Sequence, residues 1–180
     1  ERAELLLRAG RLLAQEHDHH GALGMLRDAY VADPGNRETF TLYEAFAYEN
    51  ERWDELMELY DRAIAHIVEQ GGRAYRPLDL YIRRGQLEYR HLDRPEAAVK
   101  SLLVALEHDP KSEAVMKMLE DIFVARQDWR GLVGAYEKRA SLARRNELFR
   151  LETLRQAARL ATSRLPAGDE QALRLWQQIH

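Results

Sequence analysis

The chain has 180 residues, enough for one sizeable core, and its 27 Lys and Arg nearly balance 30 Asp and Glu, for a formal charge of −3. This balance excludes strong electrostatic steering toward nucleic acid. The lack of cysteine excludes disulfides, thiolate catalysis and Cys-based zinc sites. No stretch approaches the roughly 20 apolar residues that span a bilayer, so we expect no membrane insertion.

Cellular location is only weakly indicated. We see no signal-peptide pattern and expect a cytoplasmic protein, although the chain opens at Glu1 without Met and can have been trimmed. The basic residues are almost all Arg, a usage associated with GC-rich bacterial genomes. The four lysines are Lys100, Lys111, Lys117 and Lys138.

The first 36 residues predict two helices joined by a short turn. Apolar residues up to Glu16 recur with the spacing of one buried helical face, and a second such face follows the turn at 17–21. Asp33 precedes Pro34 and disfavours a helical conformation there, and Asn36 can cap the next helix. Gly10 costs about 1 kcal/mol inside a helix relative to Ala, so we expect it to allow a close helix crossing at Ala22.

This stretch resembles a tetratricopeptide repeat, a helix–turn–helix unit of 34 residues. That repeat has a large residue, a Leu-Gly pair, an aromatic residue, an Ala-x3-Phe segment and a closing Pro. The corresponding residues here are Leu6, Ala9, Gly10, Leu13, Ala22, Leu26, Ala29 and Pro34. Leu occupies the aromatic positions, and Ala replaces the first Leu.

The rest of the chain repeats this unit with variations. We expect five repeats, at 3–36, 37–76, 77–112, 113–146 and 147–180, in one solenoid domain spanning 1–180. Residues at the marked positions of the repeat recur in each later unit. In the second repeat they are Phe40, Tyr43, Ala47 and Tyr60, and in the third they are Gly85, Ala98, Leu102 and Pro110. In the fourth they are Met116, Leu119, Phe123 and Tyr136, and in the last they are Leu154, Ala158, Ala172 and Trp176. Gly71 and Gly72 should end the long second helix of the second repeat. The turn near His91 is one residue longer than its equivalents.

A longer period of 76 residues lies over the repeat. It relates Trp53 to Trp129, Tyr60 to Tyr136 and Pro34 to Pro110. The sequence therefore predicts an all-α, right-handed superhelical solenoid of about ten antiparallel helices, a segment of a longer array or one that packs on another chain. Trp176 and Ile179 lack a following repeat to cover them, and we expect a further repeat, an end-to-end or dimer contact, or a partner there.

The sequence contains no pattern typical of catalysis, metal binding or cofactor binding. The cluster His17, Asp18, His19 and His20 has metal-ligand residue types, but adjacent side chains in a turn rarely converge on one ion, so we interpret it as a solvated turn. Phosphate-binding, metalloprotease and nucleophile-elbow motifs are lacking. We expect no enzyme, no metal and no cofactor. The aromatic repeat residues are interpreted as core, with Trp53 and Trp129 packing on the preceding helix.

The resemblance implies a scaffold that binds a protein or peptide on a concave groove lined by the first helix of each repeat. Carried over by position, the groove residues are Glu4, Leu7, Arg11, Ala14, Glu38, Thr41, Ala45, Tyr48, Asp79, Ile82, Gln86, Tyr89, Ala114, Lys117, Asp121, Val124, Glu152, Arg155, Arg159 and Thr162. Family members that clamp a C-terminal carboxylate use Asn and Lys there. This chain has no Asn at these positions, so that specificity is not expected.

We select the middle of the groove as the candidate binding site: Thr41, Tyr48, Ile82, Arg83, Gln86, Tyr89 and Arg90. Aromatic groups with polar tips suit a surface that is wet when empty and buried when bound. The expected ligand is an extended or helical segment with apolar anchors and some acidic character. Alternatively, Tyr48 and Tyr89 pack against the next repeat.

Two other functions stay open. The chain can be a helical accessory or regulatory domain of a larger enzyme or sensor. It can also belong to the half-a-tetratricopeptide type found in RNA-processing scaffolds, whose aromatic-rich helices resemble Tyr43–Phe46 and Leu59–Ala63. Gly10 and Pro34 fit this second type less well. No direct contact with nucleic acid is expected, because acids interrupt every Arg group.

Overall fold

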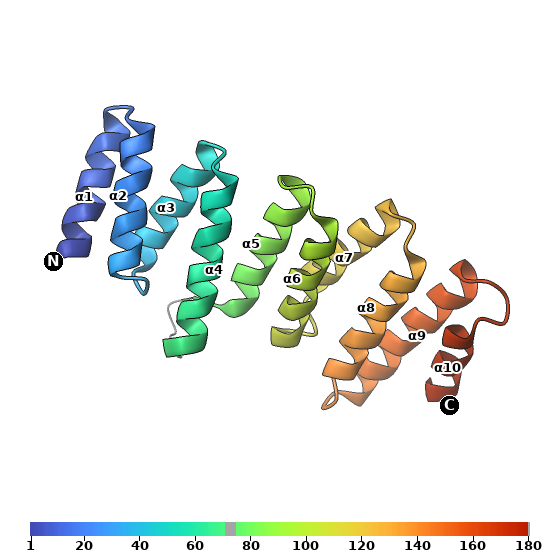
Figure 1. Ribbon diagram of the computed structural model, residues 1–180. Helices are drawn as coiled ribbons and strands as arrows, with labels where there is room; N and C mark the ends of the chain where they lie inside the picture. The colour runs from blue at the N-terminus through green and yellow to red at the C-terminus, as the bar shows by residue number, and fades with distance from the viewer. Residues whose placement is uncertain (71–74, 180) are drawn as a thin grey trace. The chain divides into compact units, whose positions relative to one another are not determined.

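The computed structural model describes residues 1–70 and 75–179, and these form ten helices and no strand. The helices are α1 Arg2–Gln15, α2 His19–Ala32, α3 Arg37–Glu49, α4 Trp53–Gln70, α5 Pro77–Arg90, α6 Pro95–His108, α7 Glu113–Ala125, α8 Trp129–Leu142, α9 Glu147–Arg164 and α10 Glu170–Ile179 (Figure 1). The predicted all-α fold of about ten helices is confirmed. The expected stop at Gly71 and Gly72 lies outside the described residues.

The chain divides into two compact units, Glu1–Leu80 and Tyr81–His180. The boundary falls inside α5, so most of that helix belongs to the second unit. Unit 1 contains α1 to α4, and unit 2 contains most of α5 together with α6 to α10. Within the described residues of each unit, no helix is both long and apolar enough to cross a bilayer.

Small residues allow the paired helices to cross closely. A Cβ on Gly10 would lie 3.0 Å from Leu26 Cγ and 3.4 Å from the Ala22 carbonyl oxygen. A Cβ on Gly85 would lie 2.9 Å from Leu102 Cγ. These distances confirm the expected role of glycine at the crossing in the first and third repeats.

In the first four repeats, the turn between the two helices uses a left-handed residue that is not glycine. The residues are His17, Glu51, Asp93 and Gln127, with φ between 50° and 62°. After each one, a backbone N–H returns to the preceding helix, as Asp128 N does to the Phe123 carbonyl at 2.9 Å. In the third repeat this bond joins Arg94 to Glu88 and spans one residue more, as the longer turn predicts.

Aspartates cap the second helix in three repeats, at Asp18, Asp128 and Asp169. The Asp18 carboxylate accepts a hydrogen bond from Gly21 N at 3.0 Å, and the Asp128 carboxylate accepts one from Gly131 N at 2.8 Å. A Cβ on Gly21 would come within 2.3 Å of Asp18 Oδ2. Such caps satisfy N–H groups that a helix start otherwise leaves without partners.

The core of unit 1 combines leucines and alanines with buried aromatic residues. Phe40, Tyr43 and Tyr60 are buried, as is Phe123 of unit 2, which confirms these aromatic repeat positions as core, whereas Tyr136 is half-buried. The Tyr75 ring lies 4.6 Å from Phe40 between centroids, and its hydroxyl donates a hydrogen bond of 2.7 Å to the Pro34 carbonyl. Tyr75 thereby ties the start of the third repeat to the turn that ends the first.

The core of unit 2 is mainly aliphatic but contains two buried charged side chains. Arg139 is 3% exposed, donates from Nε to the Pro110 carbonyl at 2.8 Å and pairs with Glu113. Its guanidinium lies 4.9 Å from the Phe149 ring centroid. Glu88 is also 3% exposed, and it accepts hydrogen bonds from Ser101 Oγ at 2.6 Å and Arg84 Nε at 3.2 Å.

The last helix is better covered than the sequence suggests. Ile179 is half-buried against the core formed by α8, α9 and α10. Trp176 is 36% exposed, and its Nε1 donates to Thr162 Oγ1 at 3.1 Å. Ile179 therefore packs on a core shared with α8, and Trp176 has a hydrogen-bond partner in its own repeat. Leu173, at 55% exposure, is the more open apolar side chain of α10.

Candidate functional site

The first of two neighbouring hollows in unit 2 lies between α5, α6 and α7. Its volume is about 50 Å³, and its lining residues are Gly85, Gln86, Tyr89, Arg90, Leu102, Met118, Asp121 and Ile122. The buried side chains of Leu102 and Ile122 make an apolar floor. Gln86, Arg90 and Asp121 bring hydrogen-bonding groups to the rim. This combination can hold a small apolar group while fixing the polar atoms beside it.

The second hollow lies between α7, α8 and α9 and is larger, with a volume of about 430 Å³. It is lined by Lys117, Glu120, Asp121, Val124, Trp129, Leu132, Tyr136, Gln156, Leu160 and Arg164. Val124 is 48% exposed although it is apolar. Together with the half-buried Trp129 and Leu160 it gives the hollow an accessible apolar wall.

Charged and polar groups of the second hollow are already paired inside the protein. Lys117 Nζ lies 3.0 Å from Asp121 Oδ1, and this contact raises the pKa of Lys117. The Tyr136 hydroxyl donates to Glu120 Oε1 at 2.5 Å, and burial, followed by this bond, raises the pKa of Tyr136. Both carboxylates of the hollow therefore have a partner from this chain.

Arg164 covers one wall of the second hollow. Its guanidinium carbon lies 4.5 Å from the centroid of the Trp129 ring, close enough for a cation–π contact. A cation on a ring is held less tightly than one in a buried ion pair, so Arg164 keeps hydrogen-bond donors for a ligand.

Three of the seven candidate site residues line the first hollow: Gln86, Tyr89 and Arg90. Ile82 is half-buried and Arg83 is exposed, both on α5, and neither belongs to the lining of the two hollows. Tyr89 is half-buried at the hollow.

The other two candidates, Thr41 and Tyr48, lie on α3 in unit 1. The Thr41 hydroxyl donates to the Arg37 carbonyl at 2.9 Å, within its own helix. Tyr48 is 53% exposed, and its ring meets Trp53 edge-on at 5.4 Å between centroids. That contact confirms that Trp53 packs on the preceding helix.

The 76-residue period relates these two residues to the second hollow. Thr41 corresponds to Lys117 and Tyr48 to Val124, and both counterparts line the hollow. The same period relates the hydrogen bond from Tyr60 to Glu44, at 2.8 Å, to the bond from Tyr136 to Glu120. The hollow residues Lys117, Asp121 and Val124 of α7 are thus indicated both by this period and by the family positions. Nothing comparable indicates Leu160 and Arg164.

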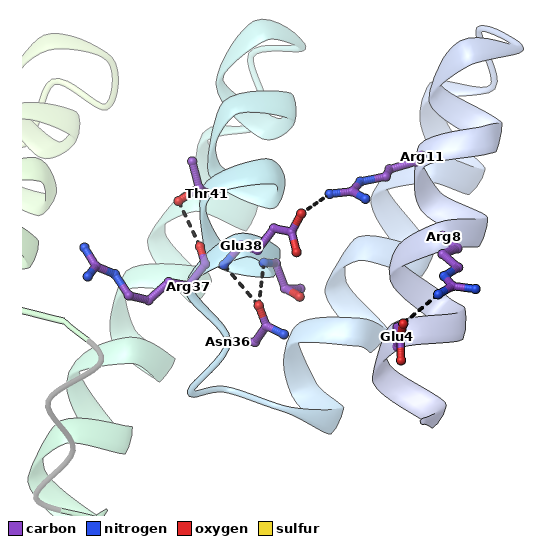
Figure 2. A network of polar contacts seen from close by, with 8 residues as sticks. Glu4, Arg8, Arg11, Asn36, Arg37, Glu38 and Thr41 are labelled. Carbon is purple, nitrogen blue, oxygen red and sulfur yellow. Dashed lines mark hydrogen bonds and ion pairs between the residues drawn. The ribbon is translucent and has the colours of Figure 1, made fainter.

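The acids that the family positions place on the rim of unit 1 are neutralised by arginines. Figure 2 shows Glu4 beside Arg8, at 2.7 Å, and Glu38 of α3 paired with Arg11 of α1. The backbone N–H of Glu38 also binds the capping Asn36 side chain at 3.0 Å. The rim of α1 and α3 is therefore a set of ion pairs rather than an uncompensated acidic surface.

The described residues contain no group of three or more His, Asp or Glu side chains that could hold a metal ion. In the turn cluster, His17, Asp18, His19 and His20 are all exposed. The His19 ring stacks on Phe46 of α3, at 5.7 Å between centroids, so it also packs between repeats.

Comparison with known proteins finds similarity in structure only. No family model matches the sequence, and no curated protein matches it. The crystal structure of MamA is 14% identical over 99% of this chain and 90% of its own, with a TM-score of 0.53. YrrB, described as a TPR protein with an unusual peptide-binding site, is 14% identical over 97% of this chain and 82% of its own, with a TM-score of 0.48. The paired helices, their glycine crossings and the similarity to MamA show that this chain has the tetratricopeptide-repeat fold.

Proposed function

We propose that this chain is a non-catalytic scaffold that binds a peptide or protein segment on the face of unit 2 built from α5, α7 and α9. The observation that carries the proposal is the pair of adjacent hollows, which share Asp121 as a lining residue. The first has an apolar floor and a polar rim, and the second has an accessible apolar wall beside charged and polar groups. Successive side chains of a bound segment can use such hollows as anchoring points.

The chemistry of the hollows favours a segment over a small metabolite. The first hollow is small and the second is open, so neither alone would enclose most of a compact ligand, as small-molecule sites do. Two shallow hollows side by side suit a chain that runs across several helices.

The residues that we assign to the contact are Gln86, Tyr89 and Arg90 at the first hollow and Lys117, Asp121 and Val124 at the second. Ile82 and Arg83 on α5 extend the same face. Thr41 and Tyr48 provide the corresponding positions on α3 of unit 1.

Selection of binding peptides tests the proposal without knowledge of the natural partner. A library of random peptides of about 12 residues is selected on the purified protein, long enough to cross three helices in extended form. Dissociation constants of the selected peptides are then measured by fluorescence anisotropy. Tyr89→Ala should weaken them by about 1 kcal/mol or more, which is about fivefold. Val124→Asp should weaken peptides that use the second hollow.

Tyr81→Ala is the matched control for Tyr89→Ala. Tyr81 also lies on α5, but its ring stacks on His108 at 5.7 Å and lines neither hollow. It should change thermal stability without changing affinity. A library that yields no binder, or binders indifferent to both Tyr89→Ala and Val124→Asp, would contradict the proposal. If Tyr89→Ala and Tyr81→Ala lower thermal stability equally and neither changes peptide affinity, Tyr89 contributes to packing alone.

A further inference from the structure

The charge of unit 2 and the lining of its second hollow point to an acidic partner segment that carries one large apolar anchor. This inference deepens the proposed function and rests on it. Its starting point is α9, whose exposed side chains include Arg155, Arg159 and Arg164. Within residues 1–70 and 75–179, none of these three arginines has a carboxylate partner, and only Arg164 has a ring contact, with Trp129.

The position of the arginines relates them to the second hollow. Arg155 and Arg159 each precede a residue that lines it, Gln156 and Leu160, and Arg164 lines it directly. Gln156, Leu160 and Arg164 recur at every fourth residue on the face of α9 that lines the hollow, and Arg155 and Arg159 lie on the adjoining face of the same helix.

The acids of the same hollow do not cancel this charge. Asp121 is paired with Lys117, and Glu120 accepts the hydrogen bond from Tyr136. Lys117 and Asp121 form one neutral pair, and the charges of Glu120 on α7 and Glu152 on α9 stand against the three arginines of α9. The unbalanced charge around the hollow is therefore positive.

The two units also differ in net charge, and unit 2, which contains the hollow, is the positive one. Residues 1–80 contain 16 Asp and Glu and 9 Lys and Arg, a formal charge of −7. Residues 81–180 contain 14 Asp and Glu and 18 Lys and Arg, a formal charge of +4. The near-neutral total of the chain hides this division. The net positive charge of unit 2 favours acidic partners and accelerates their association.

The spacing of the arginines fits a short acidic motif. From residue 155 to residue 164, a helix rises about 14 Å at 1.5 Å per residue. An extended peptide covers that distance in about four residues. Acidic side chains at alternate positions of such a segment would face α9, while one apolar side chain of the same segment enters the hollow beside Trp129 and Val124.

A nucleic acid fits this surface less well. A phosphate backbone carries a negative charge at every nucleotide and requires a continuous basic stripe. Here Glu152 on α9 and Glu120 on α7 interrupt the basic side chains, and the apolar wall would be left uncovered. A segment with spaced acids and one anchor avoids both conflicts.

Four synthetic probes separate the contribution of charge from that of the anchor. Each is a fluorescein-labelled peptide of about 10 residues built from Ser and Gly. One has spaced Glu residues and a central Leu; the others change Glu to Gln, Glu to Lys, or Leu to Ser. Anisotropy with the full chain should rank the acidic anchored probe first, with about tenfold weaker binding of the Gln probe and of the Ser probe. Raising NaCl from about 0.05 to 0.3 M should weaken the acidic probe most.

Charge reversal on the protein provides the second arm. The double variant R155E/R159E changes two exposed side chains, so the fold should persist, and it should weaken the acidic probe by about tenfold while leaving the Gln probe unchanged. R144E/R145E is the matched control, with the same change in charge at the exposed turn before α9. It should leave the ranking of the probes intact.

The outcomes are separable from those of the proposed function. If the Gln probe binds as tightly as the acidic one, or if R155E/R159E and R144E/R145E have equal effects, the acidic partner is wrong while library-selected peptides still support the scaffold. If the acidic probe binds as well without its Leu, the anchor is wrong. If a single-stranded oligouridine displaces the acidic probe and an excess of the unlabelled Gln probe does not, the basic side chains belong to a nucleic-acid site instead. Failure of every probe overturns the inference, and the library selection then decides the proposed function by itself.

Discussion

Four residues of this chain adopt a left-handed backbone that normally favours glycine. His17, Glu51, Asp93 and Gln127 occupy the turn inside each of the first four repeats, with φ between 50° and 62°. In the last repeat a glycine, Gly168, has φ of 80° in the turn. For a residue with a Cβ this conformation costs roughly 1–2 kcal/mol. The backbone hydrogen bond that returns to the preceding helix offsets part of this cost. The rest remains as strain in the native turn.

Relieving the strain at one turn should stabilise the protein. We expect Gln127→Gly to raise the free energy of unfolding by about 0.5–1 kcal/mol, because the relieved strain exceeds the extra entropy of glycine in the unfolded chain. Urea denaturation followed by circular dichroism measures the change. Gln127→Ala keeps the Cβ and should give no gain. A destabilised Gln127→Gly variant would show that the glutamine side chain itself holds the turn.

These turn residues also mark a limit of sequence reasoning. Turn positions were predictable from the spacing of the flanking apolar residues, and so was the extra residue near His91. The left-handed residue was not, because Glu51 and Gln127 carry no local signal for it and His17 and Asp93 carry only the weak preference of His and Asp. Its conformation results from the hydrogen bond that closes the preceding helix, such as Asp128 N to the Phe123 carbonyl.

At the scale of the helices, close crossings at glycine define the repeat. Gly85 on α5 faces Leu102 of α6, whose side chain is 1% exposed and cannot withdraw into solvent. Gly134 lies inside α8 with nothing within 4 Å of the place that a Cβ would occupy. Two helical glycines of the same unit thus have opposite environments.

Alanine at these two glycines should change stability in opposite directions. Gly134→Ala should stabilise by roughly 1 kcal/mol through helix propensity alone. Gly85→Ala gains the same propensity but places a methyl group 2.9 Å from Leu102 Cγ, and overpacking of this kind costs about 1–3 kcal/mol. Thermal melting should therefore rise for Gly134→Ala and fall for Gly85→Ala. A rise for both variants would mean that α5 and α6 can separate without cost.

The helices and their pairing were predictable, but the hollows were not. Apolar spacing and the positions of Gly10, Gly85 and Pro110 predict the helix pairs, because these features act within one repeat. The second hollow depends on how the flank of α9 meets α7 and α8, which involves Leu160 and Arg164 at positions that no repeat motif marks. Family positions did indicate Lys117, Asp121 and Val124 on α7, since those residues face outward from their own repeat.

At the scale of the whole chain, the pair of repeats recurs with its polar contacts as well as its apolar residues. The bond from Tyr60 to Glu44 in unit 1 has its counterpart in the bond from Tyr136 to Glu120 in unit 2. Tyrosines are buried in unit 1, and Tyr136 of unit 2 is half-buried. Burial raises the pKa of Tyr30, Tyr43 and Tyr136, and neighbouring acids add to the effect for Tyr43 and Tyr136.

The protein should therefore unfold at alkaline pH. Tyrosines of the unfolded chain ionise near pH 10, while the folded state keeps the buried ones neutral. Their contribution to stability is complete below pH 10 and is lost as the pH rises further. Tyrosinate absorbance and circular dichroism should change together in one transition above pH 10, and Tyr136→Phe should make that transition less steep. Complete ionisation of all eight tyrosines near pH 10 with the helices intact would contradict this expectation.

Arg139 makes the end of the chain behave as a single opening unit. Its side chain contacts the Pro110 carbonyl of the third repeat, Glu113 of the fourth and the Phe149 ring of the fifth. If α9 and α10 alone opened, this buried cation would lose the ring that covers it. Amide hydrogens of α8 and α9 should then exchange with solvent in one event rather than in succession from the last helix. A solenoid can unfold one repeat at a time from its end, but the contacts of Arg139 should make the fourth and fifth repeats open together.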